Sequence, residues 1–544
     1  MPARQITADQ AAELIKDNTT LATAGFIGIG FAESLAKALE KRFLSTGTPN
    51  QLTLVYAAGQ GDARDKGLNR LAHPNLLKRV IGGHWGLAPR LGQLALDNQI
   101  EAYNLPQGVI CHLYRDIAAG RPGTISQIGL ETFVDPLQEG GKINHRTQEE
   151  IVERIELNQQ PYLFYKAFPI HAAFLRGTTA DQQGNISMEK EALPLEALAL
   201  AQAVHNCGGQ VFVQVERVTE THHLPADRIR IPSVLVDYIV IADAEDHMQT
   251  FSEHYNPLYT GEIKAPVKTT HQPLSARKVI VRRALMELRK DSVVNLGIGM
   301  PEMISSVAAE EGRLGEFTLT VEPGGIGGQP ASGLSFGAVA NAHAIIDQPA
   351  QFDFYDGGGL DQAFLGLAEV STEGHVNVSR FGTKLAGCGG FINITQSTQD
   401  LYFLGTFTSG LQELEIKDNQ LNIRANGSGK KFKSQVEQIT FNGSFAIEKG
   451  QKVTFITERA VFRLTQAGLK LIEIAPGVDL QKDILDMMEF KPIIDETYDL
   501  MDPRLFNEGP MNLQYAGSMP ISHMRSLWRG LTPQNGKENP HTAK

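Results

Sequence analysis

Residues 293–309, VVNLGIGMPEMISSVAA, predict a short apolar strand, a glycine turn and a helix whose apolar residues fall at helical spacing. The same order occurs near the start of the chain, where TLATA at 20–24 precedes the turn GIG at 28–30 and a helix-like stretch at 32–39. Strand, glycine turn and helix form the unit of a largely parallel sheet covered by helices. The sequence therefore predicts an α/β fold.

The two halves of the chain share three motifs in the same order. GIGFAE at 28–33 recurs as GIGMPE at 297–302, TLVYAAG at 53–59 as TLTVEPG at 318–324, and AFL at 173–175 as AFL at 363–365. An ordered internal repeat indicates duplication of one structural unit. The interval between the second and third motifs is about 75 residues longer in the first half, so residues from about 85 to 160 are interpreted as an insertion.

A chain of 544 residues is too long for one hydrophobic core. Residues 253–273 are rich in proline and lack periodicity, which places the domain boundary near 270. We expect two related, open, largely parallel-sheet α/β domains, at 1–270 and 271–531. Residues 532–544 are polar and are expected to form a flexible tail.

Composition argues against several classes of function. The net charge of −11 opposes binding to nucleic acid or to an anionic membrane. The sequence has no apolar run of the ~18 residues that a membrane span needs, so a cytoplasmic location is expected. The three cysteines, Cys111, Cys207 and Cys388, form no Cys-x-x-Cys pair, so no disulfide framework or metal site is expected. We expect them to be buried thiols.

Glu322 marks the main difference between the repeats, because the matching residue in the first half is Ala57. It ends an apolar strand and precedes four closely spaced glycines, at 324, 325, 327 and 328. Ligands of open parallel sheets bind beyond this end of the strands. Glu322 is therefore a candidate nucleophile, and the alternative is a glutamate held in a turn by a salt bridge.

The glycine turns lack the third glycine of the dinucleotide fingerprint and the Gly-Lys-Ser/Thr ending of a P-loop. Contact with the pantetheine or a phosphate of CoA fits them, as does simple packing of strand against helix. Residues 333–337, GLSFG, match the nucleophile elbow of serine hydrolases. The elbow needs a strand directly before the serine, and a polar loop precedes Ser335, so we reject Ser335 as a nucleophile.

Six further motifs carry a family resemblance. They are GGHWG at 82–86, NLPQG at 104–108, VE at 321–322, FYDGGGLD at 354–361, GCGG at 387–390 and ITERAVF at 456–462. Over nearly its whole length the chain resembles the class I CoA-transferases, and most closely the acetate or propionate CoA-transferases that carry both halves in one chain. Pro323 departs from the wider family, which often has a small residue there.

The resemblance implies a ping-pong reaction in which Glu322 attacks an acyl-CoA thioester and then carries CoA as a glutamyl thioester. It implies oxyanion donors in Gln107 and in a backbone N–H of the Gly389–Gly390 pair, for which we select Gly390. It also implies contacts with CoA from Asn295, Leu296, Gly297, Ile298, Gly299, Gly358 and Gly389.

The resemblance further implies that coenzyme A is a substrate and covalent intermediate, with no tightly bound cofactor and no metal. The expected partners are an acyl-CoA, a short-chain carboxylate and further copies of the same chain. Two alternatives stay open, namely an acyl-CoA hydrolase on the same scaffold and a non-catalytic sensor of CoA thioesters. The sequence does not fix the preferred acyl group.

Overall fold

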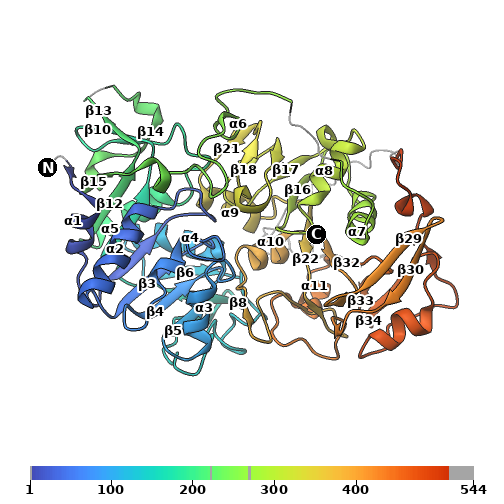
Figure 1. The fold of residues 1–544 in the computed structure, drawn as a ribbon. Helices are drawn as coiled ribbons and strands as arrows, with labels where there is room; N and C mark the ends of the chain where they lie inside the picture. Colours follow the sequence, from blue (N-terminus) through green and yellow to red (C-terminus); the bar gives the residue numbers. More distant parts are fainter. Residues whose placement is uncertain (1–2, 221–222, 267–270, 514–544) are drawn as a thin grey trace, which may run out of the picture.

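The computed structural model describes residues 3–220, 223–266 and 271–513, which form two α/β halves side by side (Figure 1). The first half is built on an eight-stranded sheet in which every neighbouring pair is parallel. In spatial order its strands are β1 (Arg4–Gln5), β15 (Tyr238–Ile241), β12 (Gln210–Val215), β9 (Ala172–Arg176), β2 (Thr20–Thr23), β3 (Leu52–Tyr56), β4 (Leu77–Gly82) and β5 (Glu101–Asn104).

Helices cover both faces of this sheet. Successive side chains of a strand point to opposite faces, and the interior strands carry apolar side chains on both. Leu21 and Leu54 pack on one face with α1 (Ala8–Leu14), α2 (Glu33–Thr46) and α3 (Pro89–Leu96). Ala22 and Val55 pack on the other with α4 (Gln107–Ala118) and α5 (Ala197–Asn206). A small four-stranded sheet lies beside it, in the order β13 (Arg217–Thr219), β10 (Thr179–Asp181), β11 (Ile186–Ser187) and β14 (Ile229–Ile231).

The second half contains a ten-stranded sheet. Its order is β21 (Ala344–Ile345), β18 (Gly325–Ile326), β17 (Thr318–Thr320), β16 (Val293–Leu296), β22 (Gln362–Gly366), β27 (Asp400–Leu404), β32 (Lys452–Ile456), β33 (Ala460–Thr465), β34 (Gly468–Ile474) and β35 (Asp499–Leu500). The strands from β17 to β32 are parallel, and antiparallel pairs flank them. Helices α7 (Ala276–Leu285), α8 (Met303–Glu310), α9 (Gln348–Asp356), α10 (Phe391–Ser397) and α11 (Gly443–Glu448) surround the sheet.

The order of strands agrees with the predicted repeat. In the first half β12, β9, β2 and β3 are neighbours in that order, and in the second half β27, β22, β16 and β17 have the same order. Strand β2 is followed by the glycine turn and α2, and β16 by the corresponding turn and α8. The predicted fold class, two related and largely parallel α/β units, is therefore confirmed.

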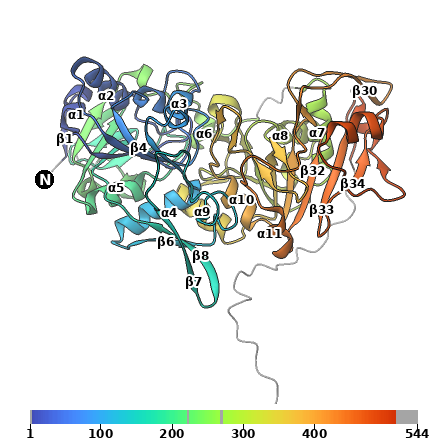
Figure 2. The same cartoon turned by 90° about the horizontal axis from the view of Figure 1, so that it is seen from below.

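The predicted insertion at about 85–160 does not form a separate unit. Its β5 extends the main sheet, and its α4 packs against α9 of the second half. Only β6 (Gly123–Ser126), β7 (Val152–Leu157) and β8 (Gln160–Lys166) form an additional sheet, whose β7–β8 hairpin projects from the molecule (Figure 2). The predicted boundary falls beside residues 267–270, which lie outside the described ranges together with the predicted tail at 532–544.

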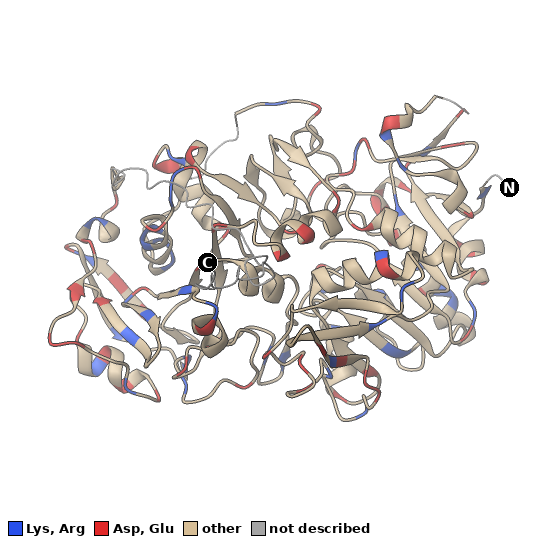
Figure 3. Ribbon diagram, turned by 180° about the vertical axis from the view of Figure 1, so that it is seen from behind, with Lys and Arg blue, Asp and Glu red and all other residues tan. Residues whose placement is uncertain are grey.

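Charged side chains of both signs are interspersed along the chain (Figure 3). Within the described ranges, none of the helices has the length and apolar character required to cross a lipid bilayer.

Main-chain hydrogen bonds join the two halves along the loop 386–390. The N–H groups of Trp85 and Gln107 donate to the carbonyls of Ala386 (2.7 Å) and Gly389 (2.9 Å), and the N–H of Gly389 donates to Gly83 (2.8 Å). The buried side chain of Asn104 adds a further link, since its Oδ1 accepts from Cys388 N–H at 2.9 Å. This loop is therefore fixed against the first half.

We predict that Asn104→Leu destabilises the contact between the halves. Nδ2 of Asn104 also donates to the carbonyls of Gly82 and Gly83, so the change leaves several buried polar groups unpaired, each of which costs about 1–3 kcal/mol. The thermal unfolding midpoint should fall by several degrees in calorimetry. The exposed Gln93→Leu on α3 is the control, and an equal midpoint for both variants would contradict the prediction.

Candidate functional site

A cavity of about 320 Å³ lies between the two halves and receives side chains from both. The first half contributes Phe26, Ile27, Gly59, His84, Leu87 and Gln107. The second half contributes the turn 295–298, Glu322, Phe336, residues 365–368, the segment 378–391 in part, and Ile394. Most of the wall is apolar, and among the described residues Glu322 is the only carboxylate and Lys384 the only Lys or Arg that lines the cavity.

Glu322 lies directly beyond the carboxyl end of β17, where the sequence places it. Its neighbours Val321 and Pro323 are buried, and the side chain reaches into the cavity wall. Burial raises the pKa of the carboxyl group to about 7, and the backbone N–H of Gly390 offsets part of this rise. Glu322 is thus poised between its neutral and ionised forms near neutral pH, which suits a carboxylate nucleophile.

Gly390 approaches Glu322 so closely that any side chain there would collide with it. A Cβ at Gly390 would overlap Oε2 of Glu322. The neighbouring Gly389 has φ of +51°, in the left-handed region that glycine adopts most readily. Glycine at both positions therefore brings a main-chain segment of the second half against the carboxylate.

Gln107 is the first residue of α4, and its side chain is almost fully buried at 1% exposure. Its amide Nε2 is buried and has no hydrogen-bond partner in the described part of the chain. A Cβ at Gly389 would lie 3.6 Å from Oε1 of Gln107, so the amide is adjacent to the loop that carries Gly390. A buried, unsatisfied donor costs free energy unless a ligand pairs with it.

Asn295 lies at the end of β16 beneath the same cavity. Its Nδ2 donates to the hydroxyl of Tyr355 (3.2 Å), which in turn donates to Oγ1 of Thr320 (2.8 Å). This network orients the amide, whose buried Oδ1 has no partner among the described residues. Asn295 therefore offers an unused acceptor to a molecule in the cavity.

The sequence matches proteins of known activity over most of its length. A family model described as Coenzyme A transferase matches residues 5–242. The caffeate CoA-transferase of Acetobacterium woodii is 46% identical over 93% of this chain and 98% of its own length. The acetate CoA-transferase YdiF of Escherichia coli K12 is 45% identical over 93% of this chain and 96% of its own.

The chain belongs to the coenzyme A transferase family.

Solved structures agree with the assignment of the chain to this family. The crystal structure of the YdiF acyl-CoA transferase apoenzyme from E. coli O157:H7 has a TM-score of 0.90, with 44% identity, and covers 94% of this chain and 98% of its own. Another structure of that enzyme, described as a thioester complex with CoA, has a TM-score of 0.89, 44% identity and the same coverage. The predicted family is therefore confirmed.

The structure brings most of the predicted site residues of this CoA-transferase together. Asn295, Leu296, Gly297 and Ile298 line the cavity with Glu322, Gln107, Gly389 and Gly390. Gly299 continues the turn but does not line the cavity, and a Cβ there would meet no atom within 4 Å.

Gly358 is placed differently from the prediction. It follows the end of α9 with φ of +81°, and its N–H donates to the carbonyl of Tyr355 at 2.9 Å. Gly358 therefore lies at the end of the helix and does not line the cavity, and its contact with CoA stays a prediction.

Two polar residues of the cavity were given no role in the sequence analysis. His84 belongs to the GGHWG motif, and its position in that family-typical segment was the available signal. Lys384 follows the turn between the short strands β25 (Arg380–Phe381) and β26 (Lys384–Leu385), far from Glu322 in sequence, so no local pattern indicated it.

Glu302 also has a pKa raised to about 7 by burial, but it does not line the cavity.

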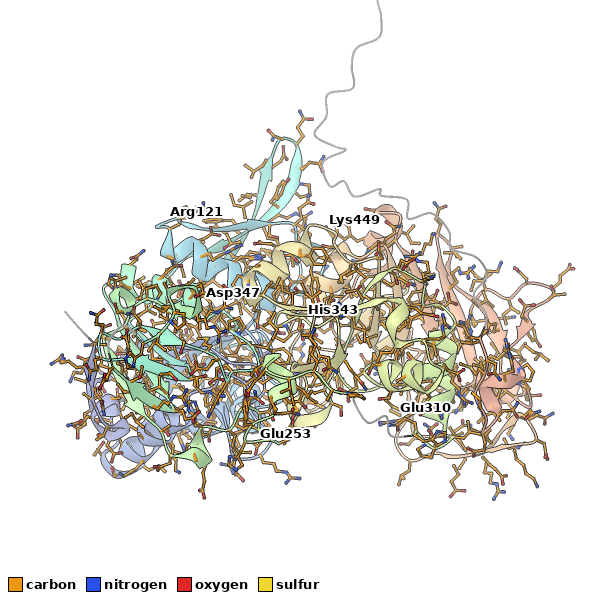
Figure 4. The ribbon with its side chains drawn as sticks, turned by 90° about the horizontal axis from the view of Figure 1, so that it is seen from above. Arg121, Glu253, Glu310, His343, Asp347 and Lys449 are labelled. Carbon is orange, nitrogen blue, oxygen red and sulfur yellow. The ribbon has the colours of Figure 1, made fainter. Side chains whose placement is uncertain are left out.

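The rejected serine motif does not form a nucleophile elbow. Ser335 ends a 3-10 turn, Gly333–Ser335, rather than following a parallel strand. Its hydroxyl is within hydrogen-bond distance of Thr250 Oγ1 (2.8 Å) and donates to Glu253 (3.0 Å), which is labelled in Figure 4.

In the described ranges no three His, Cys, Asp or Glu side chains cluster in a way that could hold a metal ion.

We predict that Gly390→Ala abolishes most of the CoA-transferase activity. The added methyl overlaps Oε2 of Glu322 and forces the carboxylate or the loop to move. A displacement of about 1 Å at a reacting group costs on the order of a hundredfold in rate. Gly315→Ala is the control, because a Cβ there meets no atom within 4 Å. Steady-state assays with a panel of acyl-CoA donors test this, and equal rates for the two variants would contradict it.

Proposed function

We propose that this CoA-transferase moves CoA between short acyl groups and short-chain carboxylates, in the manner of an acetate or propionate CoA-transferase, through a covalent thioester on Glu322. One observation carries the proposal: a carboxylate with a pKa of about 7 lies beside the N–H of Gly390 in a cavity that also contains the unpaired amide of Gln107. This combination places a nucleophile next to hydrogen-bond donors for a developing oxyanion.

In the first half-reaction, an oxygen of ionised Glu322 attacks the thioester carbonyl of the acyl-CoA, and the C–S bond breaks. CoA leaves as a thiolate, and an acyl-glutamyl anhydride remains. The thiolate then attacks the glutamyl carbonyl, which releases the acyl group as a carboxylate and forms the glutamyl-CoA thioester. An incoming carboxylate reverses these steps, so no ATP is consumed, because the bonds exchanged have comparable energy.

The remaining cavity residues have defined tasks in this scheme. Nε2 of Gln107 and the N–H of Gly390 donate to the oxyanion of each tetrahedral intermediate, where one such donor contributes about 3 kcal/mol. The turn from Asn295 to Ile298 contacts the pantetheine arm, and Oδ1 of Asn295 accepts from an amide N–H of that arm. Gly389 lets the main chain approach CoA without a side chain in the way.

The names of the relatives support this reaction and bear on the substrate. Two relatives are named acetate CoA-transferase and caffeate CoA-transferase, so similar chains are named for carboxylates of very different size. The CoA thioester complex of the E. coli protein supports a covalent route. The wall around Phe26, Ile27 and Leu87 is apolar, which favours an uncharged acyl group.

We predict that CoA becomes attached to Glu322. Incubation with propionyl-CoA, without a carboxylate acceptor, should raise the protein mass by one CoA, and peptide mapping should place the adduct on Glu322. Glu322→Ala should show no adduct and should lose on the order of 10³-fold or more in turnover. An adduct on another residue, or full turnover of Glu322→Ala, would exclude the proposed nucleophile.

Addition of acetate separates the transferase from the hydrolase. The thioester of a transferase should persist in buffer and discharge when acetate is added, with formation of acetyl-CoA. Rapid release of propionate and free CoA without acetate would instead indicate an acyl-CoA hydrolase. Failure of every short acyl donor to react would favour a sensor.

We predict that thioester formation depends on pH with a midpoint near 7. Glu322 must be ionised to attack, and its raised pKa keeps it protonated at lower pH. The rate should therefore rise about tenfold per pH unit below the midpoint and level off above it. Stopped-flow measurement with propionyl-CoA between pH 5 and 9 tests this.

Glu302→Gln is the control for the pH profile, because Glu302 also has a pKa of about 7 and lies outside the cavity. The midpoint should be unchanged in this variant. If the pH dependence disappears in Glu302→Gln, the titration does not belong to Glu322.

A further inference from the structure

His84 is a half-buried imidazole in the cavity wall that the steps above do not use. It follows the carboxyl end of β4 and lines the same cavity as Glu322. Nδ1 is buried without a partner, and no hydrogen bond to Nε2 is present among the described residues either. A buried Nδ1 without a partner costs free energy in a folded protein, whereas Nε2 is not buried and is free to pair with a ligand in the cavity.

The ring lies between the oxyanion donors and the apolar wall. A Cβ at Gly389 would lie 3.6 Å from Cδ2 of His84, the same distance as from Oε1 of Gln107. Nδ1 packs against Gly59, whose Cβ, if present, would lie 2.5 Å away. Nδ1 is therefore enclosed by protein, whereas Nε2 is the nitrogen that remains accessible from the cavity.

His84 is neutral under physiological conditions. Burial and, to a smaller extent, the positive charge of Lys384 together lower the pKa of its ring to about 4. A neutral imidazole carries one N–H. A hydrogen on Nδ1 would leave a buried donor unpaired, whereas a hydrogen on Nε2 points a donor at the cavity contents, so the second tautomer is favoured.

Lys384 supplies a positive charge that attracts the carboxylate substrate into the largely apolar cavity. Within the described part of the chain it is the only Lys or Arg that lines the cavity, and no carboxylate there forms a salt bridge with it. It also lies close enough to His84 to affect the pKa of that ring. Its ammonium group lies 5.4 Å from the centroid of the Phe381 ring. The charge is thus available to a substrate.

We propose that His84 and Lys384 form the binding site for the carboxylate substrate, in which Nε2–H of His84 donates to one carboxylate oxygen while the other attacks the glutamyl thioester. This inference rests on the proposed function. A neutral donor holds the carboxylate in place without forming an ion pair with Glu322, and Lys384 attracts the anion from solution. The hydrophobic part of the acid then extends along Ile27 and Leu87.

The test isolates the step in which the carboxylate acts. The full-length protein is converted to its CoA thioester with propionyl-CoA and freed of excess donor, and single-turnover discharge by acetate is then followed as acetyl-CoA. His84→Leu should form the thioester but discharge it about tenfold to a hundredfold more slowly, the usual effect of one hydrogen bond to a charged group. The exposed His145→Leu is the matched control and should discharge at the wild-type rate.

Two conservative variants identify which ring nitrogen of His84 donates to the carboxylate. Glutamine places its amide nitrogen near the position of Nε2, and asparagine near that of Nδ1, so His84→Gln should restore most of the rate and His84→Asn should not. Wild-type discharge by His84→Leu, or rescue by Asn alone, would overturn the proposal. Equal loss of thioester formation and of discharge, without rescue by Gln, would show a structural role and would also overturn it.

Lys384→Met should slow discharge by acetate and weaken its dependence on ionic strength, whereas Lys384→Arg should keep both. Thioester formation from propionyl-CoA is the same kind of half-reaction in the opposite direction, so its second-order rate should fall by a similar factor in Lys384→Met. A loss that disappears when propionyl-pantetheine, which lacks the phosphates of CoA, replaces propionyl-CoA would assign Lys384 to those phosphates and remove it from the carboxylate site. Absence of any thioester in the wild type would instead overturn the proposed function, and the carboxylate site with it.

Discussion

The removal of one carboxylate from water is the constraint on which the site depends. Glu322 has a pKa of about 7 because protein surrounds it, and the main chain at Gly390 is near enough to replace part of its hydration. A carboxylate without its full water shell attacks a thioester more readily than a solvated one. Glu322 is half-buried, so the surrounding structure removes part of its water shell and holds hydrogen-bond donors beside the carboxylate.

The loop 386–390 maintains this arrangement. It belongs to the second half, yet its main chain bonds to Gly83, Trp85 and Gln107 of the first half. The core that includes α4 and α9 is continuous across both halves, so the cavity has rigid walls on both sides. The halves therefore act as one catalytic unit rather than as two independent domains.

Duplication followed by divergence explains the distribution of roles. Ala57 and Glu322 lie just beyond the equivalent strands β3 and β17, so the proposed nucleophile occurs in only one of the two copies. The first half instead provides the amide of Gln107 and the imidazole of His84. A site between two related units can thus assign the nucleophile to one unit and substrate-binding groups to the other.

The sequence by itself determined the α/β class, the repeat and the position of Glu322, because strand, glycine turn and helix are local patterns with characteristic periods. Motif resemblance indicated Gln107, the turn after β16 and Gly390. Only the tertiary structure showed that Gly358 lies outside the cavity, that β5 within residues 85–160 joins the main sheet, and that His84 and Lys384 lie near each other. These facts depend on contacts between residues far apart in the chain, which no local pattern records.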